Sequence, residues 1–156
     1  MAASKFFTYN SALKHIINGN IKLYSHTLKG MLLRDSYSPS TASHSSLAQV
    51  SAFQATATGS LVPVVTLGGI NITGSGSEIV KIDANDMNFT QNGETIVSAK
   101  YLALYAESAS SGGVDNLLWG FVNLDSASAS ASLGNSTQVN INWNSLGIVK
   151  FRSNAA

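Results

Sequence analysis

The sequence of 156 residues contains no cysteine, which excludes disulfides, thiolate metal sites and cysteine nucleophiles. Charged residues are scarce as well. They make up 11% of the chain, whereas about a quarter is usual in globular proteins. Serine, threonine, asparagine and glycine take the remaining polar positions. A free surface usually carries more charge, so this composition favours a subunit whose surface is partly covered by neighbours in an assembly.

Long apolar runs are also missing. No stretch approaches the roughly 18 consecutive apolar residues of a membrane span, so we expect no membrane partner. The N-terminus lacks the apolar region of a secretory signal, so we expect no such signal. The net charge of +1 gives no strong field that would attract nucleic acid, so we expect no nucleic-acid partner.

The charge is nevertheless uneven along the chain, because five cations precede the first acid, Asp35. These cations are Lys5, Lys14, Lys22, Lys29 and Arg34. One interpretation is a solvated basic surface on a single element. The other is a surface that docks onto an acidic partner.

No catalytic or metal-binding motif is present. The three histidines, His15, His26 and His44, lack the HxH and HExxH spacings of zinc sites, and no serine lies in a GxSxG turn. The stretch from Asp83 to Asn88 carries oxygen ligands of the kind Ca²⁺ prefers. It lacks the EF-hand pattern, and an Asx-rich turn between strands is the favoured interpretation. We therefore expect no enzymatic activity, no cofactor, no metal and no small-molecule substrate.

One helix is predicted near the start, over about residues 9–18. Tyr9, Leu13, Ile16 and Ile17 form an apolar stripe with helical spacing, and Gly19 can end the helix. Such a short helix needs to dock its stripe on another surface to be stable.

The segment 35–60 is rich in serine and threonine and is predicted to be a loop or arm. Its second part, from Leu47 to Gly59, suits either a helix or extended structure, and extended structure is favoured. The predicted strands are Ile21 to Tyr24, Lys29 to Leu33, Leu61 to Leu67, Ile70 to Thr73, Ile79 to Asp83, Met87 to Thr90, Thr95 to Ala106, Leu117 to Leu124, Gln138 to Asn144 and Leu146 to Phe151.

Several local signals refine this pattern. Pro63 predicts an edge strand, and Asn92-Gly93 predicts a hairpin. Gln138 to Asn144 alternates strictly, which indicates a half-buried strand, and Leu146 to Phe151 could be its hairpin partner. So many short strands separated by turns predict a single mainly β domain over residues 1–156. We expect an antiparallel β-sandwich or barrel-like fold with one short N-terminal helix.

Several stretches together resemble a known protein family. They are Tyr9 to Leu23 with its helix ending in Asn18-Gly19, Lys29-Gly-Met-Leu-Leu33, Ser36-Tyr-Ser-Pro39, the strand Ile96 to Tyr105, Leu118 to Asp125, and Val139 to Trp143 followed by Gly147-Ile148. This order is similar to that of small structural proteins encoded among the head and tail genes of tailed bacteriophages. The chain departs from the family pattern at Lys100, where arginine is usual, and in the Ser/Ala run from Ser126 to Ser132.

The resemblance implies a non-enzymatic virion protein on the capsid surface that is made in the cytoplasm of the bacterial host. It implies a decoration or cement protein that binds the major capsid protein shell, with a homo-oligomer, favoured as a trimer, as the binding unit. The alternatives are a tail tube, tail-completion or head–tail adaptor protein, and a receptor- or carbohydrate-binding β-sandwich. The candidate partner contacts lie in the basic N-terminal segment and in the arm, and they are Lys5, Lys14, Lys22, Tyr37 and Phe53.

Overall fold

The computed structural model describes residues 6–57, 60–74, 79–90, 96–124, 138–143 and 147–152. The protein is mainly β, with 51% of its residues in strands and 12% in helices, and its sheets are antiparallel. The predicted fold class is thereby confirmed, including the single helix near the N-terminus.

The first elements are β1 (Phe6–Thr8), α1 (Asn10–Ile17), β2 (Leu28–Arg34), the 3-10 helices η1 (Leu47–Gln49) and η2 (Ser51–Phe53), β3 (Thr56–Ala57), β4 (Ser60–Leu61), β5 (Val65–Thr66) and β6 (Asn71–Thr73). The remaining strands are β7 (Ile79–Asp83), β8 (Met87–Thr90), β9 (Ile96–Val97), β10 (Ala99–Ser111), β11 (Val114–Asn123), β12 (Gln138–Ile141) and β13 (Val149–Arg152).

The two longest strands form the centre of the fold. β10 and β11 are neighbours in a five-stranded antiparallel sheet with the order β1-β11-β10-β2-β5. They are joined by Gly112 and Gly113, whose φ angles are +60° and +81°. A two-residue turn with both φ angles positive matches the twist of paired strands, and glycine adopts it without steric cost. The two glycines therefore fix the pairing of Ser111 with Val114 at the end of the hairpin.

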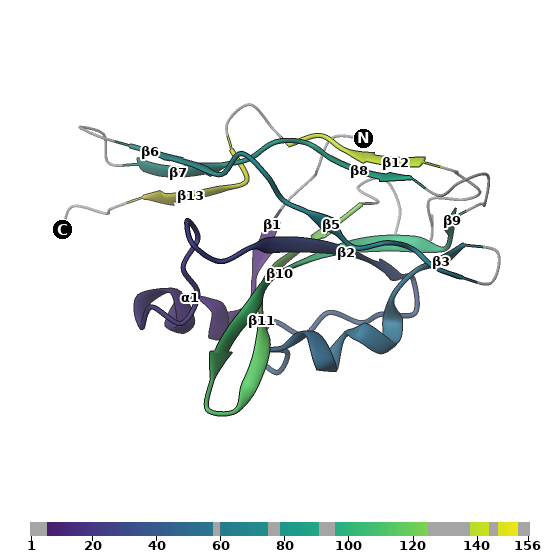
Figure 1. The fold of residues 1–156 in the computed structure, drawn as a ribbon, viewed down its shortest axis with the longest axis horizontal. Coiled ribbons are helices and arrows are strands. Elements are labelled where there is room, and N and C mark those ends of the chain that lie inside the picture. The colour runs from purple at the N-terminus through teal and green to yellow at the C-terminus, as the bar shows by residue number, and fades with distance from the viewer. Residues whose placement is uncertain are drawn as a thin grey trace.

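The central sheet is covered on both faces (Figure 1). α1 and the two 3-10 helices lie on one face, and the sheets β12-β8 and β13-β7-β6 lie across the other. A small sheet of β4, β3 and β9 lies at one end. This arrangement explains the nearly continuous apolar runs in β10 and β11, because a strand covered on both faces has no side exposed to water. Within the described residues, the sheets form layers and do not close into a barrel.

Two glycines in the central sheet allow the outer elements to approach its backbone. A Cβ atom at Gly30 would lie 2.5 Å from the Cε of Met87, so the absence of a side chain lets β8 pack directly on β2. A Cβ atom at Gly120 would overlap the ring of Phe6 and lie 2.6 Å from the carbonyl oxygen of Phe7. Gly120 is therefore required for the pairing of β1 with β11.

Two predicted local structures were wrong. The segment from Ile21 to Tyr24 is a turn, in which the backbone N–H of His26 donates to the Lys22 carbonyl at 2.9 Å. The first part of the segment predicted as extended, residues 47–53, forms η1 and η2. A capping box explains η1, because the Ser46 and Gln49 side chains each hydrogen bond to the other's backbone. The local hydrogen bonds thus outweigh the strand propensity of Val50 and Phe53.

Three expected strand arrangements also differ. The run from Leu61 to Leu67 contains two short strands, β4 and β5, with Pro63 in the gap between them, although β5 does lie at a sheet edge. The Asn92-Gly93 turn lies outside the described residues, but the strands on either side of it pair elsewhere, β8 with β12 and β9 with β3. β13 pairs with β7 and not with β12.

The pairing of β8 with β12 follows from matched alternation. Met87 and Phe89 of β8 are buried, and they lie opposite the buried Ile141 and Val139 of β12. The exposed Asn88 lies opposite Asn140, and the two side chains share a hydrogen bond. Each strand thus buries one face and exposes the other to water. The alternation predicted for Gln138 to Asn144 is confirmed over the described part of β12.

Candidate interaction surface

Helix α1 buries only part of its apolar stripe. Tyr9 at the N-cap and Ala12 are 0% exposed, and Ile16 packs against the core. Leu13 is 43% exposed and Ile17 is 83% exposed, so the fold itself covers only the part of the stripe that Tyr9 and Ile16 form. The reason is geometric. Positions 9, 12 and 16 share one helix face, whereas positions 13 and 17 lie one above the other on the adjacent face.

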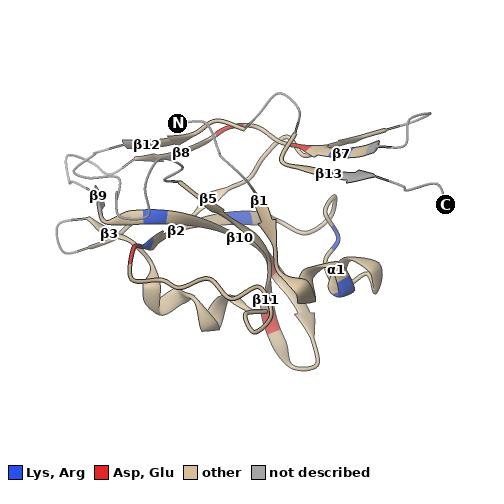
Figure 2. Cartoon of the chain, turned by 180° about the vertical axis from the view of Figure 1, so that it is seen from behind, with Lys and Arg blue, Asp and Glu red and all other residues tan. Residues whose placement is uncertain are grey.

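The exposed face of α1 carries positive charge that the fold does not neutralise. Lys14 and Lys22 are exposed, and neither forms an ion pair with any residue that the structure describes. Two other cations of the same basic segment are used internally. Lys29 forms an ion pair with Glu107 at 2.5 Å, and the Arg34 guanidinium donates to the Ala52 carbonyl at 2.6 Å. Figure 2 shows basic residues on α1 and on the loop that follows it, with no acidic residue on either element.

The predicted contact residues therefore separate into groups. Lys14 lies on α1 together with Leu13 and Ile17, and Lys22 lies on the loop that follows the helix; both lysines are exposed, as the interpretation of a basic docking surface requires. Lys5 lies outside the described residues. Sequence reasoning did not single out Leu13 and Ile17 as exposed residues. The signal was present, because Ala12 and Ile16 continue the buried face that Tyr9 begins.

The end of α1 is held rigidly against the central sheet. The backbone N–H groups of Asn20 and Ile21 both donate to the His15 carbonyl, at 2.8 and 3.1 Å. The Asn20 side chain donates to the hydroxyl of Ser111 in β10 at 3.1 Å and lies 3.3 Å from His15 Nδ1. Partial burial and the neighbouring Lys14 charge lower the pKa of His15. His15 thus favours its neutral form, and the positive charge of this surface comes from the lysines.

Tyr37, a predicted contact residue, lies in the core, and that prediction is corrected here. Its side chain is 2% exposed, and its hydroxyl lies 2.8 Å from the hydroxyl of Tyr9 and 2.8 Å from Nδ1 of His44. Burial, together with the hydrogen bond to Tyr37, raises the pKa of Tyr9 far above its usual value. Burial also raises the pKa of Tyr37. A buried side chain with these partners gives no surface for a second protein, so Tyr37 orders the loop after β2.

The predicted arm is a layer of the fold. The Leu118 backbone N–H donates to the Ser45 carbonyl at 2.9 Å, and the Ala55 N–H donates to the Leu32 carbonyl at 2.8 Å. Phe53, the other predicted contact in the arm, is half-buried in η2, and its ring centroid lies 5.5 Å from that of Tyr37. Phe53 thus packs on the core with one side and leaves only part of its ring accessible.

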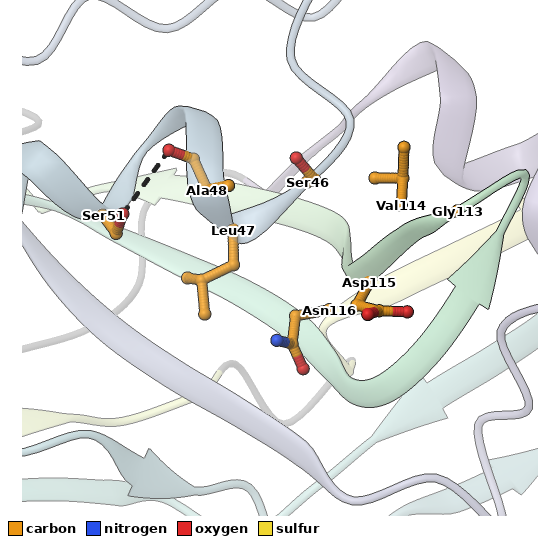
Figure 3. A pocket seen from close by; sticks show the side chains of 8 residues that line it. All are labelled: Ser46, Leu47, Ala48, Ser51, Gly113, Val114, Asp115 and Asn116. Carbon is orange, nitrogen blue, oxygen red and sulfur yellow. Dashed lines mark hydrogen bonds between the residues drawn. The ribbon is translucent and has the colours of Figure 1, made fainter.

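A hollow of about 480 Å³ lies between η1 and the start of β11 (Figure 3). It is lined by Ser46, Leu47, Ala48, Ser51, Gly113, Val114, Asp115 and Asn116. Asp115 is the one ionisable side chain in this lining. The amide oxygen of Asn116 already accepts the backbone N–H of Ser108 at 2.9 Å. A single carboxylate with hydroxyl and amide neighbours does not form the acid–base pair that general acid–base chemistry uses.

The acidic stretch after β7 has a structural use. The Asp86 carboxylate accepts a hydrogen bond from the Asn142 side chain at 2.7 Å and from the backbone N–H of Trp143 at 2.9 Å. These two hydrogen bonds lower the pKa of Asp86. The indole N–H of Trp143 donates in turn to the Asn85 carbonyl at 3.1 Å. Asp83 lies 3.7 Å from the ammonium of Lys81. The turn therefore ties β8 to the end of β12.

No three histidine, aspartate or glutamate side chains converge as a metal site within the described part of the chain. None of the helices in the described ranges is long and apolar enough to cross a membrane. Comparisons of the chain with family models, with curated proteins and with solved structures gave no match.

Proposed function

We propose that the chain is a structural protein of a tailed-bacteriophage virion, which binds the outer surface of the major capsid protein shell and stabilises it. The observation that carries this proposal is the exposed face of α1. It presents Leu13, Lys14 and Ile17 to solvent, and Lys22 is exposed on the loop that follows; neither lysine has an ion-pair partner among the described residues. Exposed apolar side chains grouped with charge of one sign are typical of a protein contact.

The sequence resemblance gives the proposal its virion context. The helix ending in Asn18-Gly19 and the strand Ile96 to Tyr105 are similar to stretches of small phage structural proteins. A decoration protein binds a repeated lattice many times over, so modest contacts at each site produce firm attachment when the binding unit is an oligomer. We propose a cyclic homo-oligomer, with a trimer favoured because threefold positions recur across capsid lattices.

The composition and the surface fit a subunit that is covered by neighbours. Charged residues make up only 11% of the chain. Besides the two on α1, the large apolar side chains that are strongly exposed are Tyr24, Leu61, Val64, Val80 and Val114. They belong to several elements, which suits a subunit with more than one neighbour. Catalysis finds less support, because Asp115 is the single ionisable residue in the hollow beside η1.

The test is to measure the mass of the purified protein by light scattering and then its co-sedimentation with capsid shells that lack accessory proteins. The shells are assembled from the major capsid protein of the same genome. A trimer that sediments with the shells and saturates them supports the proposal. A protein that stays in the supernatant at every concentration contradicts it, and binding to isolated tails would assign the chain to the tail.

A further inference from the structure

The four residues Leu13, Lys14, Ile17 and Lys22 form what we call the α1 surface. We propose that the α1 surface is the contact with the shell, and that its partner is an apolar hollow on the capsid protein rimmed by carboxylates. This inference rests on the proposed function and names the chemistry of its partner. The inference goes beyond the proposed function, because a decoration protein could equally bind through its loops or sheet edges.

The apolar part of the surface argues for burial against another protein. Ile17 is 83% exposed, and Leu13, one helical turn away, is 43% exposed. Burial of large apolar side chains is the main favourable contribution to most protein contacts, so two such side chains on one turn form a small energetic centre for a contact. The hydrogen bonds from Asn20 and Ile21 to the His15 carbonyl hold this turn in place before any partner binds. Little conformational entropy is therefore lost on docking.

The positive charge of the α1 surface indicates the charge that the partner's contact surface carries. The first 34 residues contain five cations and no acid, and Lys14 and Lys22 have no ion pair within the described residues. A partner that buries Leu13 and Ile17 must bring its own groups close to both lysines. Carboxylates at the rim of the partner's hollow satisfy this requirement, whereas a basic or wholly apolar rim would leave the lysines uncompensated.

A second copy of this chain fits the α1 surface less well. The exposed acids in the described part of the chain are Asp35 directly after β2, Asp86 between β7 and β8, and Asp115 in β11, so they stand on three separate segments. The Asp86 carboxylate already accepts two hydrogen bonds. None of these elements presents a pair of carboxylates beside an apolar hollow, as two lysines around two apolar side chains require.

The experiment compares binding of full-length variants to empty capsid shells, with the fraction bound measured by sedimentation over a range of protein concentrations. Ile17→Gln removes the apolar anchor and keeps a residue of good helix propensity at an exposed position. Lys14→Glu combined with Lys22→Glu reverses the charge. The matched controls are Leu61→Gln in β4, which is 60% exposed, and Lys150→Glu in β13, which is exposed. β4 pairs with β3 at the end of the molecule away from α1 (Figure 1), and β13 belongs to the separate sheet β13-β7-β6.

We expect each α1 variant to weaken shell binding by about tenfold or more, as for the central residues of an interface. Each control should bind within about twofold of the unmodified protein, as contacts outside the energetic centre do. Added salt should weaken binding of the unmodified protein, because it screens the lysine–carboxylate attraction. In the charge-reversed variant added salt should strengthen the remaining binding, because it screens the repulsion between glutamate and carboxylate. Circular dichroism and a melting curve confirm that every variant is folded.

The outcomes separate this inference from the proposed function. If the unmodified protein does not bind shells, the proposed function fails and this inference fails with it. If the unmodified protein binds and both α1 variants bind equally well, the function stands and the α1 surface is overturned as the contact. If the α1 variants change the mass of the free oligomer and leave shell affinity intact, the surface joins copies of this chain, which also overturns the inference.

Discussion

The hydroxyl oxygens of Tyr9 and Tyr37 lie 2.8 Å apart in the core and join the start of α1 to the loop after β2. The direction of this hydrogen bond follows from its neighbours. The backbone N–H of Ser40 points at Nδ1 of His44 at 3.4 Å, and an N–H can only donate, so Nδ1 is an acceptor. Tyr37 therefore donates to His44, and Tyr9 donates to Tyr37.

This direction predicts unequal costs for removing the two hydroxyls. In Tyr9→Phe, Tyr37 keeps its acceptor, and the loss should be about 1 kcal/mol in the free energy of unfolding. In Tyr37→Phe, the buried Tyr9 hydroxyl loses its acceptor and His44 keeps only the longer hydrogen bond from the Ser40 backbone, so the loss should be about 2–3 kcal/mol. Urea unfolding of both variants checks the order. Equal losses, or a larger loss in Tyr9→Phe, would show that the hydrogen bonds run the other way.

Stability should fall in alkaline solution. The pKa values of Tyr9, Tyr37 and Tyr105 are raised, chiefly by burial. The folded state therefore keeps these protons above pH ~10, where the unfolded chain loses them. The stabilisation is fully present below that pH and decreases above it, by about 1.4 kcal/mol per pH unit for the fully buried Tyr9.

Unfolding in urea between pH 8 and 11.5 measures this decrease. Tyr9→Phe should show a shallower decline than the unmodified protein, because one buried phenol no longer titrates. A decline of the same steepness in Tyr9→Phe would contradict the burial of the Tyr9 phenol.

Gly120 should not tolerate a side chain. Its Cβ would lie 2.6 Å from the Phe7 carbonyl oxygen and would overlap the Phe6 ring, so Gly120→Ala should push β1 away from β11. The expected cost is about 1–3 kcal/mol. Gly68→Ala is the matched control, because the nearest atom there, Nδ2 of Asn85, is 3.8 Å away. Thermal melts compare the two. Similar melting temperatures would mean that β1 does not need this close approach.

The Asp86 carboxylate should stabilise the protein down to acidic pH. Its pKa is lowered, first by the hydrogen bond from Asn142 and then by that from the Trp143 backbone. The stabilisation is therefore present above about pH 3.9, the usual value for aspartate, and is lost as the pH falls through the lower folded value. Asp86→Ala should remove this acid-dependent step, as followed by the NMR signal of the Trp143 indole N–H. Asp115→Ala, on the exposed part of β11, should leave it in place.

The sequence pattern predicted the parts of the fold that local periodicity determines. The alternation around Val139 and Ile141 identified β12, and the apolar run from Leu117 identified a strand covered on both faces. The partner of each strand depends on distant residues. β8 joins β12 because their buried positions match across about 50 intervening residues, which no local turn signal encodes. Asn92-Gly93 therefore predicted the wrong partner for β8.

The candidate site was predictable only where it depends on the identity of single residues and not on which residues meet in space. The excess of cations before Asp35 indicated Lys14 and Lys22, because charge is read directly from the residues. The burial of Tyr37 depends on Tyr9 and His44 meeting it in space, and the predicted loop composition gave no sign of that network. The exposure of Ile17 depends on which face of α1 the central sheet covers. A helical stripe wider than the area available for docking leaves one edge in water.

The measurement that tests the central claim most directly is the temperature at which capsid shells break open as the protein is added. A protein that binds the intact shell and not the broken shell must raise this temperature. The rise must level off when every lattice position is filled. Our account predicts a saturable rise that the Ile17→Gln and Lys14→Glu/Lys22→Glu variants reach only at higher concentrations. A breakage temperature that stays unchanged at saturating protein would contradict a stabilising role on the shell.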